Sequence, residues 1–282
     1  MIDPDYLKAF IDSAFKEDIG DGDHTSLACI PHEQEGKAQL LVKQSGILAG
    51  VEVAQQIFRQ FDPSLQVEIY IKDGTIVNPG DVAFVVKGTV ISILQCERLV
   101  LNLMQHMSGI ATQTRQYVEK IAGTSAKLLD TRKTTPGMRL LDKEAVHIGG
   151  GVNHRVGLFD MILIKDNHID FAGGIENAID RVHEYLKEKK KSLKIEIEAR
   201  SLDDIERILR HNRVDRIMLD NFNTDTTKKA VKMIDGKYEI ESSGNITLDN
   251  IRDYALCGVD YISVGALTHQ VKGLDMSLKA ID

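Results

Sequence analysis

From Lys127 onward the chain alternates short apolar runs with amphipathic stretches, and this alternation constrains its fold more than any other feature. Strands that alternate with helices form a parallel sheet, and right-handed crossovers then give a doubly wound sheet or a barrel. A closed (β/α)8 barrel needs eight strands, and fewer runs are found here, so we predict an incomplete barrel of class α/β. The predicted strands are Lys127–Leu129, Met161–Lys165, Lys194–Ala199, Arg216–Leu219, Tyr238–Ser242 and Tyr261–Val264.

Between these strands, apolar residues recur at three- and four-residue steps, as they do on one face of a helix. The pattern predicts helices over Ile175–Lys189, Leu202–His211, Thr224–Met233 and Thr247–Leu256.

The first third of the chain has a different pattern, which predicts an α+β domain. Helical spacing covers residues 5–17 and Val51–Phe61, and alternating runs separated by turn residues predict strands. We expect an N-terminal α+β domain over 1–108 and a barrel-like catalytic domain over 109–282, whose last helix packs back on the N-terminal domain. The predicted N-terminal strands are Lys37–Val42, Gln66–Ile71 and Asp81–Lys87.

Composition excludes several classes of protein. The 282 residues carry 35 Lys and Arg against 42 Asp and Glu, a net charge of −7, which argues against nucleic acid or an anionic membrane as a partner. No apolar run approaches the ~20 residues of a membrane helix. The acidic N-terminus lacks the order of a signal peptide, and the three cysteines form no zinc or disulfide pattern, so we expect a cytoplasmic protein. Any anion site must therefore be a local concentration of cations.

One such cation lies on a helix between the two domains. The stretch Ser92–Ser108 is apolar nearly all round, which is typical of a buried helix. A buried arginine must be paired with an acid or line a polar site. We therefore expect Arg98 to be buried and to do one of the two.

The ends of the predicted barrel strands carry most of the polar residues that could act on a ligand. Ligands of barrels and open α/β sheets lie beyond the carboxyl ends of the strands. Cations there suit carboxylates or phosphates, and carboxylate oxygens suit Mg²⁺. Glu196 and Glu198 share one face of their strand, because side chains alternate. The cations are Arg132, Lys133, Arg155 and Lys165, and the candidate magnesium ligands are Glu198 and Asp220.

Glycine-containing loops follow the last two predicted strands, at Ser243-Gly244-Asn245 and Val264-Gly265-Ala266. Barrel phosphate sites commonly lie after these strands, where backbone N–H groups approach the ligand. A third glycine run, Gly149–Gly151, lacks the spacing of a dinucleotide-binding fingerprint. We expect it to let a loop pass close to the ligand, with His154 and Arg155 pointing into the site. The predicted site thus takes an acidic small molecule, a phosphate and a magnesium ion.

Several of these segments, in this order, resemble the nicotinate-nucleotide pyrophosphorylase (carboxylating) family, also called quinolinate phosphoribosyltransferases. The resemblance spans nearly the whole chain and includes Glu17–Thr25. Its other segments are Glu97–Asn102, Thr131–Gly137, Gly149–Arg155, Lys165–His168, Leu219–Phe222, Glu241–Gly244 and Val264–His269.

The resemblance implies a reaction: quinolinate and phosphoribosyl pyrophosphate give nicotinate mononucleotide, pyrophosphate and CO2, with Mg²⁺, in NAD biosynthesis. It also implies a homodimer in which Arg98 reaches the neighbouring subunit's site. The catalytic set would be Lys133, Lys165, Glu198 and Asp220, with Glu198 and Asp220 also holding the metal. Quinolinate and phosphate would be bound by Arg98, Arg132, Lys133, His154, Arg155 and Lys165, and the 5′-phosphate by Ser243, Gly244 and Gly265.

Some alternatives remain open on the sequence alone. The choice of Glu198 over Glu196 is one, because the spacing to Asp220 departs from the family pattern. A second alternative is that the chain is a related protein linked to molybdenum transport, which is similar to this family. A Schiff-base aldolase would use Lys165 as nucleophile. A carrier module over residues 71–88 would be modified at Lys72, although its flanking residues do not match such modules.

Overall fold

The structure is a computed structural model that describes residues 2–282. The chain divides into two compact units. The first comprises the residues up to Arg115 together with Thr134–Gly150 and Leu267–Asp282, and the second comprises Gln116–Lys133 and Gly151–Ala266. The second unit therefore interrupts the first in the sequence.

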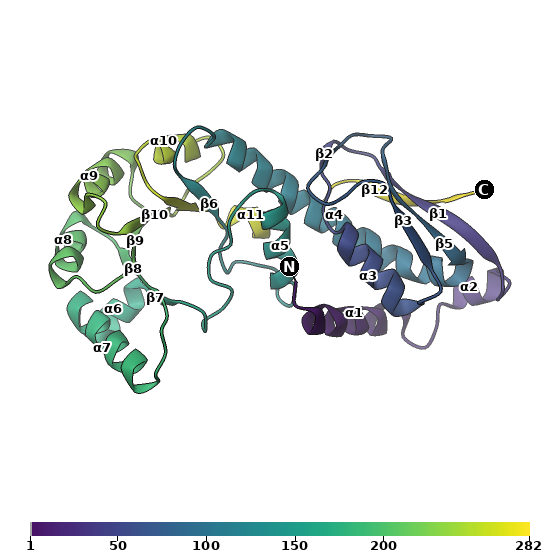
Figure 1. Cartoon of the computed structure of the whole chain (residues 1–282), viewed down its shortest axis with the longest axis horizontal. Helices are drawn as coiled ribbons and strands as arrows, with labels where there is room; N and C mark the ends of the chain where they lie inside the picture. Colours follow the sequence, from purple (N-terminus) through teal and green to yellow (C-terminus); the bar gives the residue numbers. More distant parts are fainter. Residues whose placement is uncertain (1) are drawn as a thin grey trace. The chain divides into compact units, whose positions relative to one another are not determined.

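The first unit is built on a four-stranded antiparallel sheet with the order β12-β1-β5-β3 (Figure 1). A small second sheet joins β2 to β4. Alternate residues of β1 are buried, as expected for a strand with one face on the core. The strands are β1 (Glu35–Val42), β2 (Gly46–Ile47), β3 (Gln66–Ile69), β4 (Ile76–Val77), β5 (Val82–Thr89) and β12 (Met276–Ile281).

Two helices of the first unit, α1 and α3, lie where the sequence pattern predicts them, while α4 is longer than the predicted stretch. Asp3 caps the first helix by accepting a hydrogen bond from the Tyr6 N–H at 2.9 Å. The long helix α4 is largely buried, and Ile93, Val100 and Met107 are among its core residues. These helices are α1 (Pro4–Ile19), α2 (His24–Cys29), α3 (Val51–Phe61), α4 (Val90–Lys120, whose end lies in the second unit) and α5 (Arg139–Ile148).

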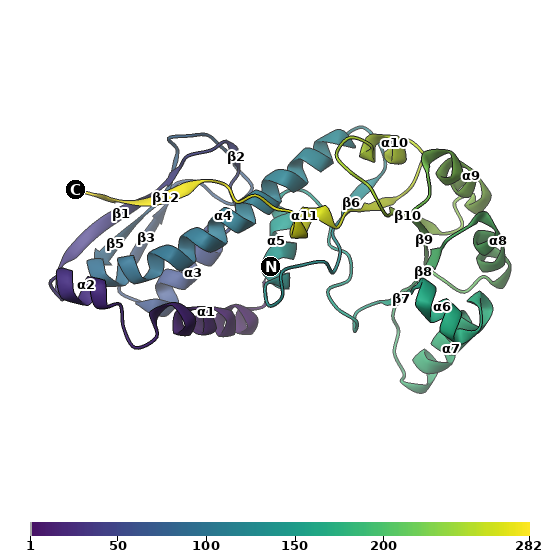
Figure 2. The same ribbon diagram turned by 180° about the vertical axis from the view of Figure 1, so that it is seen from behind.

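The second unit contains a six-stranded parallel sheet with the order β6-β11-β10-β9-β8-β7. The first and last strands of the unit are therefore neighbours, while β6 and β7 are not paired, which makes this sheet an open, incomplete barrel (Figure 2). This confirms the predicted fold class. The strands are β6 (Lys127–Leu129), β7 (Ile162–Ile164), β8 (Ile195–Ala199), β9 (Arg216–Asp220), β10 (Glu239–Ser243) and β11 (Tyr261–Ser263).

Helices follow each strand of this sheet after the first. They are α6 (Asp166–Ala172), α7 (Ile175–Glu188), α8 (Leu202–His211), α9 (Thr224–Ile234), α10 (Ile251–Ala255) and α11 (Ala266–His269). Of these, α10 is shorter than the predicted Thr247–Leu256 helix, because the Asn250 side chain accepts a hydrogen bond from the Thr247 N–H in a turn.

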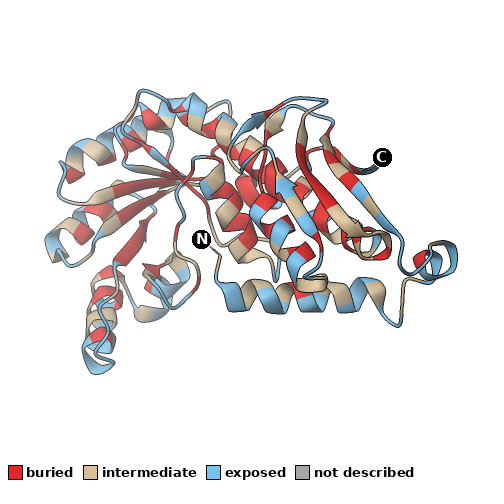
Figure 3. Ribbon diagram, turned by 45° about the vertical axis from the view of Figure 1, so that its right-hand side comes forward, coloured by how far each residue is buried: buried red, intermediate tan, exposed pale blue. Residues whose placement is uncertain are grey.

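The strands of the six-stranded sheet are mostly buried (Figure 3). Strand β8 is buried at every position, as expected for a parallel strand covered on both faces. Aspartates from neighbouring loops fix the start of two strands. Asp215 accepts from the Ile195 N–H at 2.7 Å, and Asp260 accepts from the Ile240 N–H at 2.8 Å. These bonds hold the amino ends of the strands together and leave the carboxyl ends for a site.

Two expectations from the sequence are wrong. The end of the chain is the strand β12, not a helix, and it pairs antiparallel with β1. Arg98 is exposed in the chain, not buried, because it lies on the strip of α4 that also carries the exposed residues Leu94 and Asn102. Among residues 2–282, no helix is both long and apolar enough to cross a membrane.

Candidate active site

The carboxyl ends of the parallel strands bring several of the predicted residues to one edge of the sheet. Asp220 and Ser243 end β9 and β10 and are paired in register. Glu198 is paired with Met218 in β9, one step before the end of β8. Lys165 directly follows β7. Because all six strands run in parallel, these side chains belong to the same end of the barrel.

Lys165 and Glu198 form an ion pair at this edge. The Lys165 Nζ donates a short hydrogen bond to Glu198 Oε1, and the Asp166 N–H donates to the second oxygen, Oε2, at 3.2 Å. The Glu198 side chain is 8% exposed, whereas that of Lys165 is 45% exposed. The carboxylate is therefore fixed by the start of α6, while the ammonium group faces solvent and can reach a ligand.

Asp220 provides a second carboxylate near this pair. Burial and the negative charge of Glu198 raise the pKa of Asp220 above its usual value, while Asn221 and Lys165 oppose the shift. Two carboxylates whose charges repel form a donor set that a divalent cation would stabilise, and their hard oxygens are those that Mg²⁺ prefers. The residues present therefore fit a magnesium ion.

The structure also separates Glu196 from Glu198. Both side chains extend from the same face of β8, as the alternation predicts, but Glu196 lies deeper in the sheet and is fully buried. Its carboxylate faces His154 and Arg216, not Lys165. Glu198 is thus the glutamate at the carboxyl end of the strand.

The loops after β9 and β10 are packed tightly against each other. The Asn221 N–H donates to the Ser243 carbonyl at 2.9 Å, and the Asn245 side chain donates to Asn221 Oδ1 at 3.0 Å. Gly244 adopts φ +90°, and a Cβ there would overlap Asn221 Oδ1 and lie 2.7 Å from its Cγ. Only glycine therefore fits this turn, which brings backbone N–H groups to the strand ends.

Two arginines of the second unit lie close enough to repel each other. Burial and the positive charge of Arg132 lower the pKa of Arg155. The Arg132 Nε is buried and makes no hydrogen bond to any of residues 2–282. A buried donor without an acceptor is costly, and adjacent like charges raise that cost, so an anion that binds here would relieve both. Lys133, next in the chain, is exposed.

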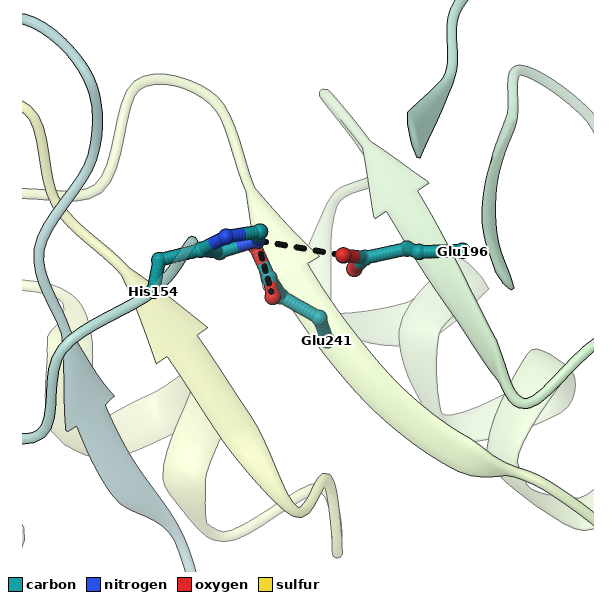
Figure 4. Close-up of side chains that lie close together, drawn as sticks. All are labelled: His154, Glu196 and Glu241. Atoms are coloured by element: carbon teal, nitrogen blue, oxygen red, sulfur yellow. Dashed lines mark ion pairs between the residues drawn. The ribbon is translucent and has the colours of Figure 1, made fainter. Parts of the chain in front are cut away.

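His154, which the sequence predicts as a ligand-binding residue, instead points into the sheet (Figure 4). Its Nε2 lies 3.1 Å from Glu196 Oε2 and 3.3 Å from Glu241 Oε2, and both carboxylates are fully buried. Burial alone would lower the pKa of His154, but the two carboxylates outweigh it and raise the pKa to about 9. The Arg155 N–H donates to His154 Nδ1 at 2.7 Å.

Arg216 completes the buried group. Its Nη1 lies 3.2 Å from Glu241 Oε2 and 3.9 Å from Glu196 Oε2, and its guanidinium stacks 4.1 Å from the centre of the Tyr261 ring. His154, Glu196 and Glu241 offer ligand atoms close enough for a metal ion. However, Arg216 already supplies a positive charge to both carboxylates, so we interpret this group as an internal ion-pair network. The sequence signal for this network is the presence of charged residues within the otherwise apolar strands β8, β9 and β10.

Arg98 belongs to the first unit, on α4, whereas the other predicted site residues lie in the second unit. No salt bridge joins Arg98 to another of residues 2–282. The carrier hypothesis for Lys72 gains no support, because the adjacent Asp73 accepts hydrogen bonds from the Val51 and Glu52 N–H groups and so caps α3. The loop at Lys72 thus has a structural role.

An open parallel barrel whose strand ends carry cations, paired carboxylates and glycine turns is typical of enzymes that act on small phosphorylated substrates. Comparison with known families agrees with this class. Residues 23–108 match the N-terminal domain of quinolinate phosphoribosyl transferase, and residues 110–279 match its C-terminal domain. The protein belongs to the quinolinate phosphoribosyltransferase family.

Individual relatives extend over the whole chain. The chloroplastic nicotinate-nucleotide pyrophosphorylase [carboxylating] of Arabidopsis thaliana is 49% identical over 97% of this chain and 82% of its own length. The crystal structure of NadC from Streptococcus pyogenes is 38% identical, covers 100% of this chain and 99% of its own, and has a TM-score of 0.94. The nicotinate-nucleotide pyrophosphorylase of Francisella tularensis gives a TM-score of 0.93 at 38% identity, covering 100% of this chain and 98% of its own.

Proposed function

We propose that this protein transfers the phosphoribosyl group of phosphoribosyl pyrophosphate to quinolinate with loss of CO2, giving nicotinate mononucleotide and pyrophosphate. Family membership supports this activity, which the names of the relatives state for those proteins. The structural observation that carries it is the buried Arg132 Nε, which has no acceptor among residues 2–282 and lies near a second guanidinium. A dicarboxylate such as quinolinate supplies the missing acceptors.

The residues of the site divide into two groups by charge. Arg132, Lys133, Arg155 and Lys165 bind the quinolinate carboxylates and nearby phosphates, because charge-assisted hydrogen bonds to carboxylates are strong. The backbone at Ser243, Gly244 and Gly265 binds the 5′-phosphate. Glu198 and Asp220 lie beside the ribose.

The chemistry follows from these positions. The bond between the anomeric carbon and pyrophosphate breaks, and the pyridine nitrogen forms a new bond to that carbon. Positive charge develops on the sugar, where Glu198 and Asp220 stabilise it. The pyridine nitrogen becomes cationic and accepts the electrons released when the adjacent carboxylate leaves as CO2, and a proton then adds to that carbon. The ring itself is therefore the electron sink.

Mg²⁺ is part of the proposal. Glu198 and Asp220 would hold it, and it would neutralise charge on the pyrophosphate leaving group. Lys165 contacts Glu198 in the structure. In the complex its ammonium group would also bind a substrate carboxylate.

We also propose a homodimer in which Arg98 acts at the site of the neighbouring subunit. The exposure of Arg98 in a single chain supports this, since an exposed guanidinium is accessible to the site of a second chain. The cytoplasmic location expected from the sequence stays a prediction.

A direct assay tests the function. The purified protein is incubated with phosphoribosyl pyrophosphate, Mg²⁺ and either quinolinate or nicotinate, and CO2 and nucleotide are measured. We expect equal amounts of CO2 and nicotinate mononucleotide from quinolinate, and no turnover without Mg²⁺. Turnover of nicotinate but not quinolinate would overturn the proposal, and trapping of a carbonyl substrate on Lys165 by borohydride would favour the aldolase.

The turn at Gly244 gives a prediction about the phosphate loop, the loop after β10 that would bind the 5′-phosphate. Replacing Gly244 by alanine should raise KM for phosphoribosyl pyrophosphate at least tenfold, because the turn must open to relieve the overlap with Asn221. A side chain in this conformation also costs roughly 1–2 kcal/mol of folding free energy. Steady-state kinetics and chemical denaturation measure the two effects.

Gly258 provides the matched control. It has the same φ of +90°, but a Cβ there would make only an ordinary contact, at 3.5 Å from Val231 Cγ1. The Gly258→Ala variant should lose a similar amount of stability from the backbone alone and keep a normal KM. An equal change in KM in both variants would show that general destabilisation, not the phosphate loop, causes the effect.

A further inference from the structure

The segment Val152–Arg155 runs along the open edge of the barrel beside β6. Val152 forms a parallel bridge with Leu129, and its N–H donates to the Leu128 carbonyl at 2.8 Å. The His154 N–H donates to Asp130 Oδ1 at 2.8 Å, and Asp130 is fully buried. The backbone of this segment is thus bound on one side, up to His154.

The side chain of His154 also fixes this segment, because it contacts buried residues of the sheet. Its Nε2 contacts Glu196 and Glu241, and its Nδ1 contacts the Arg155 N–H. Both ring nitrogens therefore lie against groups of the protein itself. This differs from the role expected for His154 from the family resemblance.

Arg155 lies immediately after this anchor. Its Nη1 donates to the Met161 carbonyl at 3.2 Å. Burial and the positive charge of Arg132 lower the pKa of the Arg155 guanidinium, and the negative charges of Glu196 and Glu198 raise it. Two neighbouring guanidinium groups repel each other, so contacts within the protein must hold Arg155 in place for an anion to bind. Arg155 has a fixed neighbour on each side in the chain. After it, the Val156 N–H donates to Asp160 Oδ2 at 2.7 Å, and before it, the backbone and ring of His154 are held by the sheet.

We infer that Glu241, with Glu196, is a positioning residue that acts through His154 to hold Arg155 beside Arg132 for recognition of the substrate carboxylate. The inference rests on the proposed function for the identity of that substrate. Glu241 comes from β10 and Glu196 from β8, so the anchor also ties the edge segment to two strands of the sheet. Arg216 balances the charge of these glutamates, which allows them to stay buried.

The first test is the Glu241→Gln variant, which keeps the size of the side chain and removes its charge. We expect KM for quinolinate to rise about tenfold, with KM for phosphoribosyl pyrophosphate changed less than about threefold, because only the carboxylate site is loosened. In an Arg155→Ala background the same substitution should have no further effect on KM for quinolinate, since it acts through that residue. Equal effects in both backgrounds would overturn the inference.

Glu239 is the matched control. It lies on the same strand and bonds to the same Arg216, at 3.2 Å, but it makes no salt bridge with His154 and is partly exposed. The Glu239→Gln variant should keep a normal KM for quinolinate. A rise in KM equal to that of Glu241→Gln would mean that disruption of Arg216 explains the effect, and would overturn the positioning role.

A second measurement does not depend on the reaction. Hydrogen exchange of the backbone amides of residues 152–156 should be faster in Glu241→Gln than in the wild type or in Glu239→Gln, because the segment loses its inner anchor. Unchanged exchange would overturn the inference. If the wild type does not turn over quinolinate, the proposed function fails, and the exchange result still decides whether Glu241 fixes this segment. If Glu241→Gln does not fold, His154→Gln serves for both measurements, with the same expected results.

Discussion

Replacement of Lys165 by alanine is expected to lower kcat/KM for quinolinate at least 100-fold while the protein stays folded. Two effects add. The substrate loses a charge-assisted hydrogen bond, and the buried Glu198 carboxylate loses the cation that contacts it. Glu198 and Asp220 then repel each other and the anionic substrates more strongly. Steady-state kinetics with quinolinate, and circular dichroism for the fold, measure the outcome.

Lys189 offers a matched control for this substitution. It also pairs with a glutamate, Glu188, at 3.0 Å, and its side chain is 51% exposed, close to the 45% of Lys165. The Lys189→Ala variant should keep normal kinetics, because exposed ion pairs contribute little. A folded Lys165→Ala variant with near-normal kcat/KM would remove Lys165 from the site.

Replacement of Arg98 by alanine should abolish most activity in the pure variant, yet mixing it with the Lys165→Ala variant should restore part of it. In a dimer with composite sites, a mixed pair has one site in which both residues are intact. Random exchange of equal amounts makes half of the dimers mixed, so we expect about a quarter of the wild-type activity. Activity is measured after subunit exchange has been verified by mass spectrometry of differently tagged subunits.

The complementation result separates two roles of Arg98. No recovery after verified exchange would mean that Arg98 acts in its own subunit or not at all. Asn102, which lies one turn further along the exposed strip of α4, provides a control substitution. The Asn102→Ala variant should be active alone, because its side chain carries no charge to pair with a carboxylate.

The sequence predicted the barrel well because its signals are local. The parallel strands and most helices follow from runs of apolar residues, and β8 and β9 lie within a residue or two of the predicted ranges. The pairing of β7 through β11 with their neighbours in the chain also follows from connectivity, whereas the pairing of β6 with β11 does not. By contrast, β12 was missed because its partner, β1, lies more than two hundred positions away in the chain. Nothing in its own composition distinguishes it from the end of a helix.

The site was predicted less completely, for a similar reason. The residue types at the strand ends predicted that Lys165, Glu198 and Asp220 share one edge of the sheet, and they lie there because parallel strands place their carboxyl ends together. The direction of His154 could not be predicted, since it depends on Glu196 and Glu241, from two other strands, and on the charge of Arg216. Likewise, the exposure of Arg98 depends on which face of α4 packs on the first unit.

The pairing of β12 with β1 has a consequence for synthesis of the chain. The barrel unit precedes the last of the three segments of the first unit in sequence, so the sheet order β12-β1-β5-β3 is completed only when the final residues have been made. Until then β1 is an edge strand with a row of backbone groups that have no strand to bond with. A nascent or truncated chain that ends before Met276 would therefore leave the edge of β1 uncovered, and we expect such a chain to associate with other chains more readily than the full chain does.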